Sequence, residues 1–119
     1  MAAMNGNEKA SCPVETTLKV IGGKWKVLII HFLLEEPRRF GELARCLGTI
    51  SPRILVQQLR ELEEDGVVVR KSYGELPLRV EYSLSALGAT LAPILYAMSD
   101  WGEAFEARSL MNTASVDTP

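Results

Sequence analysis

The sequence has few of the residues from which metal sites, disulfide frameworks and active sites are built. It holds two cysteines, Cys12 and Cys46, and a single histidine, His31. Two cysteines at this spacing make neither a disulfide framework nor a zinc site, and the histidine lies in a helical pattern. The Gly-Gly-Lys segment at 22–24 lacks the first glycine of a phosphate-binding loop. We therefore expect no enzyme, no metal and no cofactor.

Long apolar runs are also absent, and neither sign of charge dominates. No run approaches the roughly 20 residues of a membrane-spanning helix, and the polar start of the chain shows no secretory signal, so a cytoplasmic location is expected. The net charge of −2 argues against non-specific coating of nucleic acid but leaves a local basic face open. Residues 36–85 hold eight basic and eight acidic side chains, so folding would have to separate them.

The 119 residues fit one domain, and its most informative stretch is 51–66, which predicts a helix with both ends marked. Ser51 is a favoured N-cap, Pro52 suits the first helical position, and Gly66 suits the position just past the end. The helix has an apolar stripe formed by Leu55, Leu59 and Leu62.

Another face of this helix carries long hydrogen-bond donors. Arg53, Gln57 and Arg60 are spaced four and three residues apart, so they share that face. Arginine and glutamine read guanine and adenine edges in the major groove of DNA. This face predicts a DNA-reading helix; the alternative is an ordinary amphipathic helix with a solvated face.

The segments before this helix complete a helix-turn-helix pattern. We predict a short helix from Ser11 to Ile21, a central buried helix from Lys24 to Glu36, and an edge strand or turn at 38–40. A further short helix at 41–47 and a glycine-containing turn at 48–50 lead directly into the reading helix.

Two predicted strands follow, at 67–71 and 79–84, the second with strict alternation of apolar and polar residues. A hairpin directly after a helix-turn-helix makes a winged helix, with Leu76 and Leu78 exposed at its tip. Its basic residues would neutralise phosphates; they are Arg70, Lys71 and Arg79.

The last predicted helix runs from Ala86 to about Glu106, with Pro93 expected to kink it. Apolar residues repeat at spacings of three and four, as in a heptad seam: Leu84, Leu87, Leu91, Ile94, Met98, Trp101 and Phe105. A second copy of the chain is the expected partner; the alternative is that this helix folds back on its own core. Within the seam, the predicted dimer interface consists of Leu91, Ile94, Met98, Trp101 and Phe105.

The sequence also resembles a known family, the HxlR-type (DUF24) transcription regulators, over residues 12–105. The motifs that carry this resemblance are Cys12-Pro13-Val14-Glu15, Ile21-Gly22-Gly23-Lys24-Trp25, Pro37-Arg38-Arg39-Phe40-Gly41-Glu42-Leu43, Ile50-Ser51-Pro52-Arg53-Ile54-Leu55, Leu59 to Gly66, Val80 to Leu84 and Asp100-Trp101-Gly102. One departure is Leu-Pro-Leu at 76–78, where the family more often has two prolines before the basic residue.

The resemblance implies a mostly α fold with a small β-hairpin, a winged helix-turn-helix related to the MarR-type regulators. It implies a homodimer through the terminal helices that binds double-stranded operator DNA near stress or catabolic genes, with a near-palindromic site following from twofold symmetry. The predicted domains are a disordered segment at 1–10, the winged helix with its dimerisation helices at 11–107, and a frayed tail at 108–119. The candidate DNA-binding residues are Arg39, Ser51, Arg53, Gln57, Arg60, Lys71 and Arg79.

Some members of this family use the cysteine that opens the first helix to sense oxidants or electrophiles, and here that position is Cys12. A helix N-terminus stabilises a thiolate, which suits such a role, with Cys46 as a candidate second thiol. The alternative is a small packed residue without redox chemistry. For the whole protein, the alternative function is a winged-helix module that binds protein rather than DNA, which the acidic helix end from Glu61 to Asp65 favours.

Overall fold

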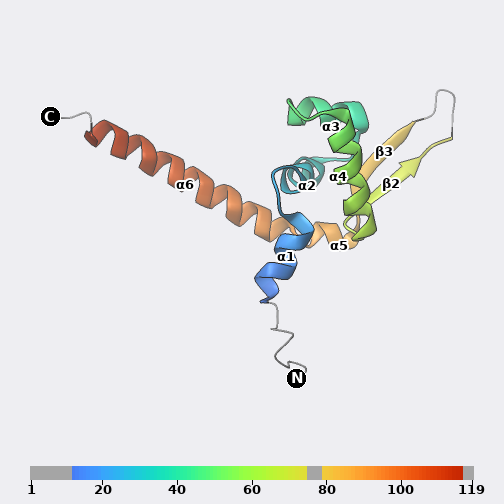
Figure 1. Ribbon diagram of the computed structural model, residues 1–119, viewed down its shortest axis with the longest axis horizontal. Helices are drawn as coiled ribbons and strands as arrows, with labels where there is room; N and C mark the ends of the chain where they lie inside the picture. Colours follow the sequence, from blue (N-terminus) through green and yellow to red (C-terminus); the bar gives the residue numbers. More distant parts are fainter. Residues whose placement is uncertain (1–11, 75–78, 117–119) are drawn as a thin grey trace, which may run out of the picture. The chain divides into compact units, whose positions relative to one another are not determined.

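The computed structural model describes residues 12–74 and 79–116, which form two compact units divided between residues 89 and 90. Figure 1 follows their helices and strands along the chain. The first unit holds α1 (Pro13–Ile21), α2 (Trp25–Glu35), β1 (Arg38–Arg39), α3 (Phe40–Leu47), α4 (Pro52–Glu64), β2 (Val68–Ser72), β3 (Val80–Leu84) and α5 (Ala86–Ala89). The second unit holds α6 (Ala92–Val116).

The core of the first unit is built around α2. This helix is apolar on most sides, and it packs against α1, α3, α4 and β3. Ile29 and Ile30 are completely buried, and Leu33 nearly so. An apolar helix of this kind needs neighbours on several sides, so the prediction of a central buried helix is confirmed.

The helix-turn-helix forms as the cap residues indicate. Gly48 ends α3 with a φ of 76°, a left-handed conformation that glycine adopts without strain. The Ser51 hydroxyl then accepts a hydrogen bond from the Ile54 N–H at 3.2 Å, which caps the start of α4. The apolar row of α4 is almost fully buried, with exposed fractions of 0% at Leu55, 1% at Leu59 and 0% at Leu62.

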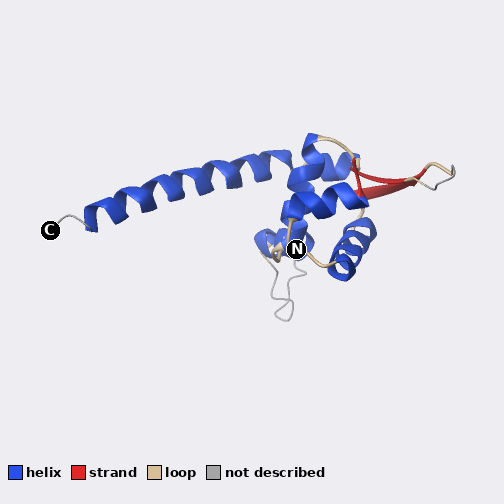
Figure 2. Ribbon diagram, turned by 90° about the horizontal axis from the view of Figure 1, so that it is seen from above, coloured by secondary structure: helices blue, strands red, loops and turns tan. Residues whose placement is uncertain are grey.

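The strands form one antiparallel sheet in the order β1-β3-β2. Val68 pairs with Leu84 and Arg70 pairs with Tyr82, so β2 and β3 make the predicted wing hairpin. Figure 2 shows this hairpin projecting beyond the helices of the first unit. Residues 75–78 lie outside the described residues, and with them the predicted exposure of Leu76 and Leu78 at the tip.

The C-terminal prediction was wrong in two respects. The expected single helix is divided into α5 and α6, and Pro93 lies in the first turn of α6, where its missing N–H is tolerated, rather than at a kink. Helix α6 also continues past Glu106 to Val116, so residues 108–116 are helical and not a frayed tail. The predicted disorder of residues 1–10 lies outside the described residues, and the 11–107 domain boundaries stay a prediction.

Within the described ranges, no helix combines the length and the apolar character needed to cross a membrane.

Candidate nucleic-acid interface

The exposed face of α4 carries four side chains in one row. Arg53, Gln57 and Arg60 are exposed as predicted, and Val56 is exposed beside them with an accessible fraction of 42%. The four positions follow the i, i+3, i+4, i+7 spacing of one helix face. Guanidinium and amide groups read base edges, while an apolar side chain can contact the methyl group of thymine. Val56 was not among the predicted DNA-binding residues, although its spacing from Arg53 and Arg60 is a usable signal.

An ion pair ties this helix to α2. The Lys26 ammonium lies 2.6 Å from one carboxylate oxygen of Glu61, and the Gln57 amide donates to the other oxygen at 3.4 Å. The hydrogen bond and the charge of Lys26 hold the pKa of Glu61 below its ordinary value. One acid at the end of α4 is therefore balanced by a cation, and the same acid orients the amide of a predicted DNA-reading residue.

The two arginines of β1 lie in different surroundings. The Arg38 side chain is fixed by contacts within the chain. Its Nε donates to the Phe32 carbonyl at 3.0 Å, and its guanidinium pairs with Glu35 at 2.5 Å. Arg39 is exposed and is the N-cap residue of α3, where its backbone N–H donates to Glu42 at 2.8 Å. Of this pair, Arg39 is the residue with a side chain accessible to a DNA backbone.

The wing separates its basic residues between two faces of the sheet. Lys71 and Arg79 each lie 5.8 Å from the ring of Tyr73, with Lys71 paired in register with Glu81. The Tyr73 hydroxyl donates to Glu81 at 2.9 Å, and this hydrogen bond raises the pKa of Tyr73. Because side chains alternate along a strand, Arg70 projects from the other face. All three basic residues were predicted to neutralise phosphates together, and the position of Glu81 beside Lys71 and Tyr73 was not anticipated.

The second unit carries the predicted interface residues on α6. The exposed fractions are 39% for Ile94, 48% for Met98, 69% for Trp101 and 47% for Phe105, whereas Leu91 is half-buried just before the helix. The Trp101 and Phe105 rings stack with their centroids 5.1 Å apart. A row of large apolar side chains in water marks an interaction surface.

Both cysteines are free thiols. Cys12 is the N-cap residue of α1, where its backbone is extended and its side chain makes no capping hydrogen bond; it is exposed. Cys46 lies on α3 and is half-buried. In the described part of the chain, no three acidic, histidine or cysteine side chains gather in a way that could hold a metal ion.

Residues 20–110 match the HxlR-like helix-turn-helix family. The chain belongs to this family. The resemblance inferred from the motifs is therefore confirmed, and the chain is a transcriptional regulator of the helix-turn-helix type. Two curated relatives from Bacillus subtilis are HTH-type transcriptional regulators. YdeP is 48% identical over 82% of this chain and 76% of its own length. YybR is 50% identical over 80% of this chain and 76% of its own length.

Solved structures confirm the winged-helix fold of this HxlR-like regulator. The oxidised form of the redox regulator HypR is 49% identical over 78% of this chain and 96% of its own length, with a TM-score of 0.75. Its reduced form is 45% identical over 86% of this chain and 99% of its own length, with a TM-score of 0.78. The reduced form of the transcriptional regulator YodB from B. subtilis is 34% identical over 80% of this chain and 94% of its own length, with a TM-score of 0.70.

Proposed function

We propose that this HxlR-like regulator binds a near-palindromic operator in the cytoplasm as a homodimer. The observation that carries the proposal is the division of α4 into two faces. One face is fully buried, and the opposite face presents Arg53, Val56, Gln57 and Arg60 together. A helix whose apolar face is packed in the core, and whose exposed face carries side chains that can read bases, fits a DNA major groove.

The remaining basic groups suit contacts to the DNA backbone. Lys71 and Arg79 lie at the wing, and Arg39 is exposed at the start of α3. The Ser51 hydroxyl uses an acceptor lone pair for the cap, so its own hydrogen is left to donate to a phosphate oxygen. Such contacts position the protein on the duplex without reading its sequence.

The dimer follows from apolar side chains that a single chain leaves in water. They lie on α6 at Ile94, Met98, Trp101 and Phe105, and α1 adds Val14 and Leu18, which are 64% and 57% exposed. Burying such rows between two copies removes apolar area from water at about 25 cal/mol per Å². Twofold symmetry would then place two reading helices roughly 34 Å apart, one turn of DNA.

The test uses the DNA immediately upstream of the protein's own gene, titrated with the full chain by fluorescence anisotropy at several salt concentrations. We expect tight binding whose affinity falls steeply as salt rises, because phosphate contacts release counterions. A scrambled duplex of the same composition is the control. Equal, weak affinity for both duplexes would favour the protein-interaction alternative, which rests on the acidic helix end from Glu61 to Asp65; within that end, Glu61 is paired with Lys26.

We further propose that thiol oxidation changes DNA affinity, with Cys12 as the sensing residue. The support is the exposed position of Cys12 at a helix N-terminus and the 49% identity to a protein described as a redox regulator. Diamide converts two thiols to a disulfide and takes up the two hydrogens, so Cys46 is the candidate second thiol. Cys12→Ser should abolish the effect of diamide on operator binding and leave binding by the reduced protein intact. Diamide-insensitive binding by the unmodified protein would contradict this role.

A further inference from the structure

The polar side chains on the exposed face of α4 differ in how firmly they are held. Gln57 donates to Glu61, one turn further along the helix, at 3.4 Å, and Glu61 is paired with Lys26 of α2. Among the described residues, neither Arg53 nor Arg60 makes a hydrogen bond or an ion pair through its side chain. Gln57 is therefore the base-reading side chain on this face that a neighbouring residue orients.

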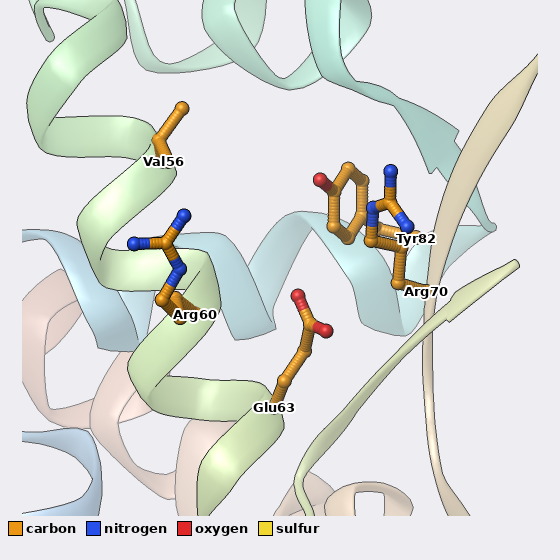
Figure 3. Close-up of a pocket in the computed structure, with 5 residues that line it drawn as sticks. All are labelled: Val56, Arg60, Glu63, Arg70 and Tyr82. Carbon is orange, nitrogen blue, oxygen red and sulfur yellow. The ribbon is translucent and has the colours of Figure 1, made fainter.

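Arg60 shows the contrast with Gln57. It borders a cavity of about 420 Å³ between α4 and the wing hairpin, and Figure 3 shows it at the edge of this hollow. The cavity is also lined by Val56, Glu63, Arg70 and Tyr82. Open space on one side lets a guanidinium reach more than one acceptor, so the surroundings of Arg60 do not select a single orientation.

Lys26 keeps Glu61 ionised and in place. Its ammonium lies 2.6 Å from one carboxylate oxygen, and the exposed fractions of the Lys26 and Glu61 side chains are 13% and 39%. The hydrogen bond from Lys26 and its positive charge lower the pKa of Glu61, so this carboxylate carries no hydrogen and can only accept. Because the Lys26 side chain is largely covered, its influence on the exposed face of α4 passes through Glu61.

A neighbour that can only accept decides which way round the Gln57 amide lies. The amide nitrogen faces Glu61, because the amide oxygen would otherwise meet a carboxylate with no hydrogen between them. Glu61 uses one amide hydrogen, and the other is left beside the amide oxygen. One donor next to one acceptor is the complement of adenine, which offers N7 as an acceptor and its N6 amino group as a donor.

Guanine is a poor match for an amide held in this way. It presents two acceptors, N7 and O6, in the major groove. To donate to both, Gln57 would have to give up its hydrogen bond to Glu61 and turn its amide oxygen toward the carboxylate. The cost of an unpaired acceptor in a site closed by DNA then acts against guanine.

We propose that Glu61, held by Lys26, fixes the Gln57 amide so that this protein reads adenine and rejects guanine at one position of each operator half-site. The assignment rests on the proposed DNA-binding function and adds to it which base Gln57 selects. Glu61 and Lys26 are positioning residues, because they act on the base through Gln57 and do not touch it.

The first experiment measures the affinity of the full chain for operators that carry each of the four base pairs at every position of one half-site. The position that Gln57 reads is the one at which Gln57→Ala abolishes a preference. We expect adenine to be favoured over guanine there by about tenfold or more. A preference for guanine or cytosine at this position, or no position that responds to Gln57→Ala, would overturn the assignment.

Base analogues at the same position test the two hydrogen bonds separately. We expect 7-deazaadenine, which lacks the N7 acceptor, to weaken binding, and purine, which lacks the amino group, to do the same. Neither analogue should affect binding by Gln57→Ala. Full affinity for both analogues in the unmodified protein would refute the reading of adenine by Gln57.

The sharpest variant is Glu61→Gln, which keeps the size of the side chain. Its new amide oxygen should accept from Lys26, because an ammonium can only donate, and its new amide nitrogen would then face Gln57. The Gln57 amide should reverse, so that guanine is bound at least as well as adenine. Glu64→Gln, the same charge change at an exposed position of α4, is the matched control and should keep the adenine preference. An unchanged preference in Glu61→Gln would refute the positioning role.

Two further variants separate positioning from a general effect on the fold. Lys26→Met should lower the ratio of adenine to guanine affinity by about threefold or more, whereas Lys19→Met, on α1, should not. In a Gln57→Ala background, Glu61→Gln should leave that ratio unchanged, because the residue it orients is gone. Equal weakening of all duplexes with the ratio preserved would show that Lys26 and Glu61 only stabilise the fold, and would overturn the proposal.

A measurement on the DNA-free chain distinguishes failure of this inference from failure of the proposed function. In the NMR spectrum, one side-chain amide proton of Gln57 should be shifted downfield, and Glu61→Ala should remove this shift while Glu64→Ala should not. Selective DNA binding without the shift would refute the positioning role and leave the proposed function standing. The shift in a protein that binds no duplex selectively would refute the proposed function, and the adenine assignment with it.

Discussion

Helices α4 and α6 both carry a row of apolar side chains, and they differ in what covers it. On α4 the exposed fractions of Leu55, Leu59 and Leu62 do not exceed 1%. On α6 those of Met98 and Trp101 are 48% and 69%. The first row is covered by the chain's own core, whereas the second is left for another surface. The first therefore contributes to the stability of a single chain, and the second is the row through which we propose that two copies associate.

The two rows also differ in side-chain type. The row on α4 is made of leucines, which fill a close-packed core. The row on α6 contains methionine and two aromatic residues, Trp101 and Phe105, which are stacked on each other. Methionine and aromatic side chains are enriched in protein–protein interfaces. The composition of each row thus agrees with its exposure.

The largest effect should come from breaking the buried row. Leu59→Ala removes methyl groups from a site that is 1% exposed and leaves a cavity, so the free energy of unfolding should fall by about 2–5 kcal/mol. Urea unfolding at fixed protein concentration measures it. Val56→Ala, on the exposed face of the same helix, should change stability by no more than about 0.5 kcal/mol. Similar losses in both variants would mean that α4 is not held by its leucine face.

The second largest effect is expected from a substitution in the exposed apolar row of α6. Met98→Glu should weaken the dimer at least a hundredfold, about 3 kcal/mol, because a charge would be buried without a partner. The helix content of the monomer should stay unchanged, because Met98 is 48% exposed in the single chain. Analytical ultracentrifugation measures the affinity of the dimer, and circular dichroism measures the helix content. Glu103→Gln on α6 serves as the control, and a dimer that survives Met98→Glu would exclude this row from the interface.

A comparable test sharpens the contrast between the exposed face of α4 and the wing. Arg53→Ala and Gln57→Ala should each reduce discrimination between operator variants by about 1–3 kcal/mol. Lys71→Ala and Arg79→Ala should instead weaken binding to all sequences alike and reduce the salt slope by about one each. Binding titrations on a set of single-base operator variants measure both. Altered sequence preference in the wing variants alone would reverse these roles.

The smallest effect concerns the ion pair that links α4 to α2. The folded-state pKa of Glu61 is lowered, so the stability it contributes is fully present above the ordinary glutamate value of about 4.3 and is lost as pH falls through the lowered value. Lys26→Met should therefore be less stable than the unmodified protein at neutral pH, by an amount that shrinks in acid. Urea unfolding across this pH range tests it, with Lys19→Met, on α1, as control. A pH-independent difference would show that the lysine acts through packing instead.

Much of the reading helix could be predicted from local sequence. Ser51, Pro52 and Gly66 mark its ends through chemistry that acts within a few residues, and the leucine spacing identifies its buried face. The alternation of the second strand likewise predicts the wing. The C-terminal helices were predicted less well, because the same heptad spacing continues through the break between α5 and α6 and does not reveal it.

Short-range patterns in the sequence are enough to predict where α4 begins and ends, which of its faces is apolar, and the family to which the chain belongs, because caps, helical periodicity and motifs are local properties. The folded chain was needed to show that Lys26 meets Glu61, that Arg70 and Lys71 project from opposite faces of the wing, and that Tyr82 lines a cavity beside α4. Each of these relations depends on how separate helices and strands are placed in the fold. Strand register and helix packing set their distances, and no short-range pattern in the chain encodes them.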